Sequence, residues 1–321
     1  MNKLSVQKFL KRQETIISVF TLLVFFAFCM LSQNFGTDSN FQLILQQVAV
    51  NGICVVGVGV VVILGGIDLS AGAVLALSGV VGGMFIKQGM PVLVAILASI
   101  GIGMLCGAFN ALLITQLSLP PIITTLATNY LFRGVAIIIT GGSWVNNFPR
   151  EFTKYGTGRI FGTSNVFWMF LIILAIVSYM MKYMNIGRKI YAVGTNNDAA
   201  DKSGISCTKV KFFGYTLCGG IIGFAGIMYA AQIGAVASTS TGLTLGTQVL
   251  AAALAGGISI AGGRGTLFGA SVGILMIGII KNGLILTKVS EFWIDAITGA
   301  IILLALALNV LNSREKRREE A

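Results

Sequence analysis

Runs of apolar residues long enough to cross a lipid bilayer follow one another along almost the whole chain. A helix needs about 20 apolar residues to span the hydrocarbon core, and only helices or closed barrels satisfy their backbone hydrogen bonds there. The runs are too long and too continuous for barrel strands, so they predict an all-α integral membrane protein with about ten transmembrane helices. The expected spans are 16–31, 43–64, 67–86, 92–117, 122–140, 166–184, 212–232, 244–260, 267–287 and 292–309.

The charge content supports this prediction. Of the 321 residues, 55% are hydrophobic and only 10% are charged, whereas a soluble domain carries about 25% charged residues. The expected surroundings of the chain are therefore membrane lipid. The net charge is +11, but the basic residues lie in short loops between apolar runs and form no single face. Binding to nucleic acid is therefore not expected.

Residues that serve in metal and catalytic sites are scarce. The five cysteines have no CxxC spacing, and the chain contains no histidine. A structural zinc site or a disulfide framework is therefore not expected. Carboxylates are not clustered either, which argues against a membrane-embedded enzyme. We expect no metal, no cofactor and no catalytic residues.

Lysine and arginine collect in three segments: the N-terminal arm (1–15), the loop at about 185–211 and the tail (312–321). Short loops rich in these residues stay in the cytoplasm, and an even number of spans allows all three to do so. Both termini are therefore predicted to be cytoplasmic, and residues 1–321 to form a single transmembrane domain. No small-x-small cleavage site follows the first apolar run, so we expect it to be an uncleaved span. In this scheme the stretch 141–165 lies on the extracytoplasmic side of the membrane, although it carries three basic residues.

Several glycines lie four residues apart within the spans, a spacing that lets helix backbones approach closely. The pairs are Gly103 with Gly107, Gly219 with Gly223, and Gly269 with Gly273. Two similar strings, GGIDLSAG at 65–72 and GGISIAGG at 256–263, indicate an internal repeat of the kind that transporters often contain. A second pair, NALLIT at 110–115 and NGLILT at 282–287, has a different offset, so one duplication does not explain both. Chance similarity remains the alternative.

Asp68 is one of very few acids in the apolar region and lies beside two glycines. A carboxylate at membrane depth usually marks a pathway, a pairing partner or a helix break. Alternatively, Asp68 and Ser70 cap a helix that begins near Leu69. The two roles are compatible.

Polar side chains inside other spans are further candidates for a path through the membrane. Amides both donate and accept hydrogen bonds, so they could line a path for a solute rich in hydroxyl groups. Hydrogen bonding between helices is the alternative role for each. The candidates for the path are Asn51, Asp68, Asn129, Arg133 and Gln232. Arg133 and Lys281 carry charge, and they either reach an interface or pair with Asp295 or Asp68.

The loop at 187–205 predicts a short cytoplasmic helix. Asn196 and Asn197 suit an N-cap, Ala199 and Ala200 favour helix, and Gly204 suits a left-handed stop. Such a helix could enter a groove on a partner, and an ordinary solvated loop helix is the alternative. We expect the membrane bundle to contact neither alanine.

Three segments together resemble the ribose-type permease family of ATP-binding cassette (ABC) importers. They are GGIDLSAGAVLALSG at 65–79, GTNNDAADKSGI at 194–205 and AALAGGISIAGGRGTLFGA at 252–270. The resemblance extends over nearly the whole chain, in order and with matching spacing. It implies a membrane subunit that dimerises with an identical or related chain, receives solute from an extracytoplasmic binding protein and is driven by a cytoplasmic ATPase.

The resemblance also implies a solute class and a docking site. The family's substrates include ribose, xylose, arabinose, rhamnose and autoinducer-2. Its cytoplasmic loop docks into the ATPase, which here implies a role for Gly194, Asn196, Ala199, Ala200, Ser203, Gly204 and Ile205. The chain has no GxxxxGK[ST] phosphate loop, so it is expected to rely on a separate ATPase. A secondary transporter driven by an ion gradient is the alternative, but proton coupling usually needs buried acids or histidines.

Overall fold

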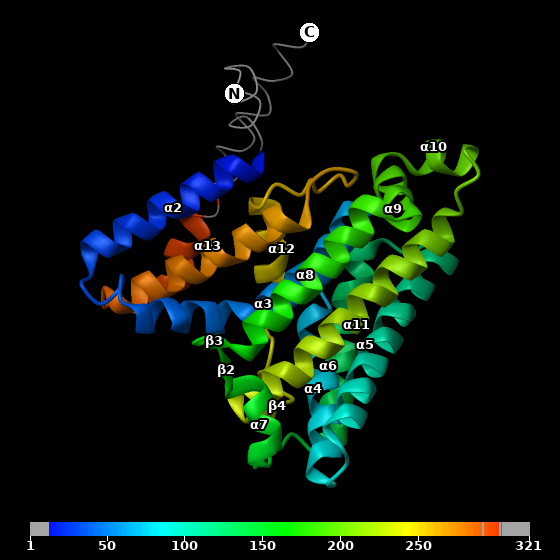
Figure 1. Cartoon of the computed structure of the whole chain (residues 1–321). Coiled ribbons are helices and arrows are strands. Elements are labelled where there is room, and N and C mark those ends of the chain that lie inside the picture. Colours follow the sequence, from blue (N-terminus) through cyan, green and yellow to red (C-terminus); the bar gives the residue numbers. More distant parts are fainter. Residues whose placement is uncertain (1–12, 291, 302, 304–321) are drawn as a thin grey trace, which may run out of the picture.

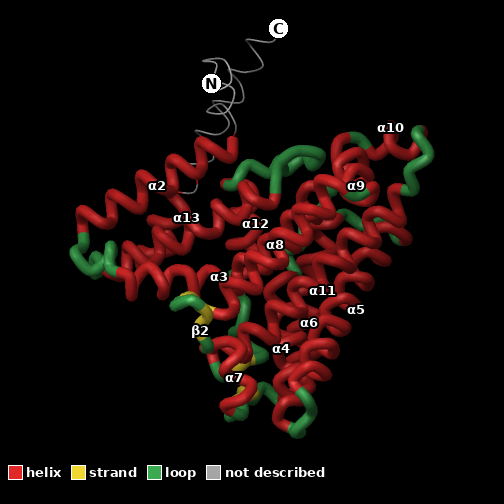
Figure 2. Tube along the Cα trace, viewed as in Figure 1, coloured by secondary structure: helices red, strands yellow, loops and turns green. Residues whose placement is uncertain are grey.

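The computed structural model describes residues 13–290, 292–301 and 303, and these are mostly helical (Figures 1 and 2). Six of the described helices are long and apolar enough to cross a membrane. They are α3 (Asp38–Ile63), α5 (Val92–Gln116), α6 (Pro121–Thr140), α8 (Asn165–Tyr183), α11 (Cys207–Ile233) and α13 (Leu267–Leu286). Shorter apolar helices are α2 (Gln13–Leu31), α4 (Ala71–Lys87), α12 (Leu245–Ala255) and a helix at Phe292–Ile301.

Each expected span contains a described helix, but two of these helices are shorter than expected. The helix α4 begins at Ala71, and residues Gly66 to Ser70 before it are neither helix nor strand. The helix α12 has 11 residues and is therefore about 17 Å long, which is too short to cross the hydrocarbon core. The last expected span, 292–309, lies partly outside the described residues. The count of ten crossings therefore remains a prediction.

The helix α11 lies at the centre of the bundle and packs against α5, α4 and α3. From Val48 onward, α3 is buried on nearly every side, as expected for a helix that is apolar all round. The helices α2, α8 and α13 complete the packing, with α13 against α2 and α3.

Closely spaced glycines bring helices into backbone contact, as the sequence predicts. A Cβ built on Gly103 of α5 would lie 2.1 Å from the carbonyl oxygen of Gly219 of α11. A Cβ on Gly273 of α13 would lie 2.1 Å from the carbonyl oxygen of Ala252 of α12. No side chain larger than hydrogen fits at either glycine, so the two helices of each pair touch directly.

The stretch 141–165, expected only as a loop, contains β1 (Trp144–Asn146), α7 (Arg150–Thr157), β2 (Arg159–Ile160) and β3 (Thr163–Ser164). The strand β1 pairs antiparallel with β4 (Ala235–Ala237), and β2 pairs with β3. Phe152 of α7 is buried, and Gly156 lies against the backbone of Gln232. Figure 1 shows this small region at the end of the molecule opposite α9 (Asn185–Thr195) and α10 (Asn197–Lys202).

Candidate functional site

The chain between α3 and α4, residues 64–70, forms a break between two helices, and we call it the break segment. Gly65 ends α3 in the left-handed conformation, with φ of +82°. Asp68 is buried, and its Oδ1 accepts hydrogen bonds from the Ser70 backbone N–H at 2.9 Å and from the Ser70 hydroxyl at 2.6 Å. Asp68 therefore binds the backbone N–H of Ser70, the residue before α4. The Ser70 side chain makes no cap hydrogen bond to α4, so the expected cap by Ser70 is not formed, and α4 begins two residues later than expected.

Neighbouring helices hold this network in place. The Asn110 side-chain amide of α5 donates to the Ser70 hydroxyl oxygen at 2.9 Å. The Cys218 thiol of α11 lies 3.8 Å from Asp68 Oδ2. Asp68, Ser70, Asn110 and Cys218 are all buried, so Asp68 contacts the interior of the bundle. Its role in a solute path remains a prediction.

Arg133 of α6 is buried and is held by one edge of its guanidinium. Its Nη1 donates to the carbonyl oxygens of Ser238 and Thr239, each at 3.2 Å. Its Nε and Nη2 atoms have no hydrogen-bond partner among the described residues. Arg133 therefore pairs with neither aspartate considered in the sequence analysis, whereas Lys281 does pair with Asp295 at 3.2 Å.

The other candidates for the path lie on three helices. Asn129 is half-buried and lies one turn before Arg133, so the two share a face of α6. Gln232 of α11 donates from Nε2 to the carbonyl oxygen of Gln46 at 3.0 Å, which links α11 to α3. Asn51 is half-buried on α3. Of the five candidates, the structure brings only Asn129 and Arg133 onto one helix face.

Thr125 lies one turn before Asn129 on the same face of α6, and the sequence analysis did not select it. Its hydroxyl oxygen accepts a hydrogen bond from the backbone N–H of Leu69 at 3.1 Å and lies 3.2 Å from the carbonyl oxygen of Ile67. A threonine in an apolar helix gives no sequence signal for such a contact, because its hydroxyl usually bonds within its own helix.

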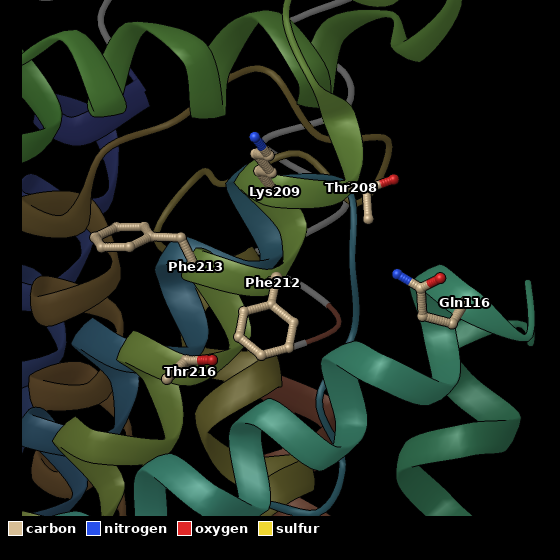
Figure 3. Close-up of a pocket in the computed structure, with 6 residues that line it drawn as sticks. All are labelled: Gln116, Thr208, Lys209, Phe212, Phe213 and Thr216. Carbon is tan, nitrogen blue, oxygen red and sulfur yellow. The ribbon is translucent and has the colours of Figure 1, made fainter.

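Two surface pockets lie away from the candidates for the path. One, of about 400 Å³, lies between α5 and α11 (Figure 3) and is lined by Gln116, Thr208, Lys209, Phe212, Phe213 and Thr216. The other, of about 310 Å³, is lined by Met84, Lys87, Gln88, Ile139, Thr140, Ser143, Trp144 and Val145. Neither pocket includes any of the five candidates.

The predicted short helix in the loop 185–211 is present as α10. The Asn196 side chain accepts a hydrogen bond from the Ala199 backbone N–H at 3.0 Å, and Gly204 has φ of +79°. The N-cap and the left-handed stop are thus confirmed. A second helix, α9, precedes α10 and was not predicted.

The residues with an implied docking role differ in exposure. Asn196, Ala199, Ser203 and Gly204 are exposed, and Ile205 is half-buried. Ala200 is only 5% exposed, because α10 packs against α9 and α11. The expectation that the bundle contacts neither alanine is therefore wrong for Ala200.

Gly194 is buried where α9 meets the end of α3. A Cβ on Gly194 would lie 2.0 Å from the carbonyl oxygen of Ile63. The backbone N–H of Gly263 donates to the same oxygen at 2.7 Å, and the Tyr191 hydroxyl donates to the Gly265 carbonyl oxygen at 2.9 Å. A Cβ on Gly262 would lie 2.7 Å from the Cα of Gly65, so the two similar strings meet beside α9, although this contact does not test whether they arose by duplication.

Comparisons with known proteins agree with this architecture. A family model described as the permease component of branched-chain amino acid transport systems matches residues 40–306. The chain is 35% identical over 305 residues to the ribose import permease protein RbsC of Escherichia coli (strain K12), covering 94% of each chain. It is 29% identical over 297 residues to the autoinducer 2 import system permease protein LsrC of Yersinia pseudotuberculosis serotype O:1b, covering 92% of this chain and 84% of the relative.

A solved structure shows the same fold. It is a metal-chelate type ABC transporter in an inward-facing conformation, with a TM-score of 0.53 and 16% identity, and the match covers 93% of this chain and 99% of the other. The resemblance to ribose-type permeases found in the sequence is confirmed by the relatives. The chain belongs to the family of permease components that is named for branched-chain amino acid transport systems.

Proposed function

We propose that the chain is the membrane-spanning permease subunit of an ABC importer, and that it carries a small sugar or sugar-like solute across the bacterial cytoplasmic membrane. The observation that carries this proposal is the 35% identity to a ribose import permease over 94% of both chains. The likeness to an autoinducer 2 import permease supports the same class of solute. The fold shared with an ABC transporter supports the importer architecture.

The proposal includes three partners. A cytoplasmic ATPase supplies energy, because the sequence has no phosphate loop of its own. An extracytoplasmic binding protein delivers the solute. A second permease subunit, either identical or related, completes the membrane part.

We further propose an even number of crossings, so that both termini lie in the cytoplasm. The start of α2 lies at the same end of the molecule as α9 and α10 in Figure 1, and α7 lies at the other end. Five basic residues between the end of α8 and the first turns of α11 favour the cytoplasm: Arg188, Lys189 and Lys202 before α11, and Lys209 and Lys211 at its start.

For the solute path we propose the face of α6 that carries Asn129 and Arg133. The Nε and Nη2 atoms of Arg133 lack partners among the described residues and are suitable donors for the hydroxyl oxygens of a sugar. Asn51 remains a weaker candidate on α3. The hydrogen bonds of Asp68 and Gln232 favour a structural role for both.

For ATPase docking we propose the surface made by α10 and the residues that flank it: the exposed Asn196, Ala199, Ser203 and Gly204 and the half-buried Ile205. The exposure of the first four leaves them accessible to a partner. The buried residues Gly194 and Ala200 support this surface from beneath.

The function is tested by purifying the permease with its ATPase and reconstituting both in liposomes with the binding protein. ATP hydrolysis is then measured with pentoses, deoxyhexoses and autoinducer-2. We expect one of these solutes to stimulate hydrolysis and to be taken up. Uptake that follows an imposed ion gradient without ATP would instead establish a secondary transporter.

A further inference from the structure

The break segment has one end beside α9 and the other against α6. The helix α9 lies in the loop between α8 and α11, which also carries the proposed docking surface and is called the docking loop. Immediately before the segment, the carbonyl oxygen of Ile63, the last residue of α3, accepts from the Gly263 backbone N–H at 2.7 Å. The backbone of Gly194 packs on the same carbonyl so closely that a Cβ would lie 2.0 Å from it. Since no flexible side chain lies between them, a shift of α9 moves the end of α3 directly.

Near its other end, the break segment is bound to α6 through Thr125. The Thr125 hydroxyl oxygen accepts from the Leu69 N–H at 3.1 Å. Its single hydrogen has three acceptors within reach: the carbonyl oxygens of Pro121 at 2.8 Å, Ile67 at 3.2 Å and Ile122 at 3.4 Å. The hydroxyl can therefore satisfy either its own helix or the break segment without losing its bond from Leu69.

The middle of the break segment is held as one unit. Asp68 binds both the backbone and the side chain of Ser70, and Asn110 binds Ser70 in turn. All three are buried, so bending this part of the segment would leave buried polar groups without partners, at a cost in free energy. The first half of the segment is tied to α3, because the Gly65 N–H donates to the carbonyl oxygen of Val62 and the Gly66 N–H to that of Val61, each at 2.9 Å. A displacement of the end of α3 is thus passed to the segment and on to Leu69.

We infer that the break segment is the mechanical connection between the ATPase-docking loop and the helix that lines the solute path, and that Thr125 is the positioning residue that joins it to α6. This inference rests on the proposed function. Asn129 and Arg133 follow Thr125 on the same face of α6 at successive turns. Motion delivered at Thr125 therefore reaches the face that is proposed to contact the solute.

The test replaces Thr125 with valine, which keeps the shape of the side chain and removes the hydroxyl. The measured quantity is the ratio of ATP hydrolysis with solute-loaded binding protein to hydrolysis without it, in the reconstituted complex. We expect the Thr125→Val ratio to fall about two- to tenfold, the range that one hydrogen bond of ordinary strength accounts for. Thr125→Ser, which keeps the hydroxyl, is expected to restore most of the ratio.

Thr124→Val is the matched control. Thr124 is also buried on α6, and its hydroxyl donates to the carbonyl oxygen of Pro120 at 2.9 Å within its own helix. Its ratio is expected to match that of the wild type. A normal ratio in Thr125→Val, or an equal fall in both valine variants, would overturn the inference. Absence of stimulation in the wild-type complex would contradict the proposed function itself.

A second measurement does not depend on any variant. Hydrogen exchange of the break segment is compared in the wild-type complex without nucleotide and with a non-hydrolysable ATP analogue. We expect exchange of the Leu69 amide to change when the analogue binds. Unchanged exchange across 64–70, with changes seen in α10, would show that docking is not transmitted by this route.

Discussion

At the scale of single residues, backbone contacts through glycine decide where segments can meet. A Cβ on Gly194 would have the carbonyl oxygen of Ile63 as its nearest neighbour, at 2.0 Å, and the backbone nitrogen of Gly263 next, at 2.7 Å. Backbone atoms cannot rotate away as the end of a flexible side chain can. The site therefore admits no side chain larger than hydrogen unless α9 moves away from the end of α3.

Gly194→Ala is expected to destabilise the protein by about 1–3 kcal/mol, because overpacking a tight contact costs that much. The measurement is the melting temperature in detergent. Gly134→Ala is the control, since nothing lies within 4 Å of a Cβ on Gly134 of α6 and alanine favours helix over glycine. Equal melting temperatures for the two variants would show that α9 is not packed as described.

Alanine substitutions at Asn129 and Gln232 are expected to have different effects on stability and on uptake. Gln232→Ala removes the bond to Gln46 and should lower stability by about 1 kcal/mol, with uptake per folded molecule unchanged. Asn129→Ala should reduce uptake and leave the melting temperature within error of the wild type. If Gln232→Ala reduced uptake and Asn129→Ala lowered only the melting temperature, Gln232 would belong to the solute path and Asn129 to the packing of the bundle.

At the scale of elements, α10 and its support α9 have distinct tasks. The exposed side of α10 carries small and polar residues, whereas Ala200 faces the protein. A large residue at Ala199 should therefore disturb only a partner, and one at Ala200 should disturb the fold as well.

Ala199→Arg is expected to reduce co-purification of the ATPase while yield and melting temperature stay unchanged. The arginine would project from an exposed position into the proposed docking interface. Thr157→Arg is the control, because Thr157 is an exposed residue on α7, at the other end of the molecule. Full ATPase recovery and normal uptake in Ala199→Arg would mean that the loop serves only as a connector.

The sequence predicts these elements to different degrees. The caps of α10 follow from Asn196 and Gly204, because such signals are local. The polar loop between apolar runs gives no sign of α9, nor does 141–165 reveal that Phe152 of α7 faces the bundle. The contact of Thr125 with Leu69 depends on tertiary packing between helices far apart in the chain, which a residue pattern does not specify.

At the scale of the whole molecule, the two ends differ in structure. One end has α9, α10 and the loop at 256–266, and the other has α7 and two small two-stranded sheets. The proposed orientation puts the first end in the cytoplasm. The same orientation should decide which reagents can reach each end in living cells.

A cysteine at Thr157 is expected to react with a membrane-impermeant maleimide in intact cells, and one at Lys202 only after permeabilisation. The wild-type chain measures the background from its five cysteines, of which Cys54, Cys106 and Cys218 are buried. Labelling of Lys202→Cys but not Thr157→Cys in intact cells would invert the orientation.

The glycine contacts between α5 and α11 also close the side of the bundle to the bilayer between these two helices. Gly103 and Gly107 of α5 lie directly against the backbone at Gly219 and Tyr215 of α11. An acyl chain cannot enter such a seam, and a transported solute cannot leave through it, because no space separates the two backbones. A one-residue insertion in α5 would turn the residues beyond it by about 100°, replace glycine by bulkier neighbours and open a lateral route to lipid.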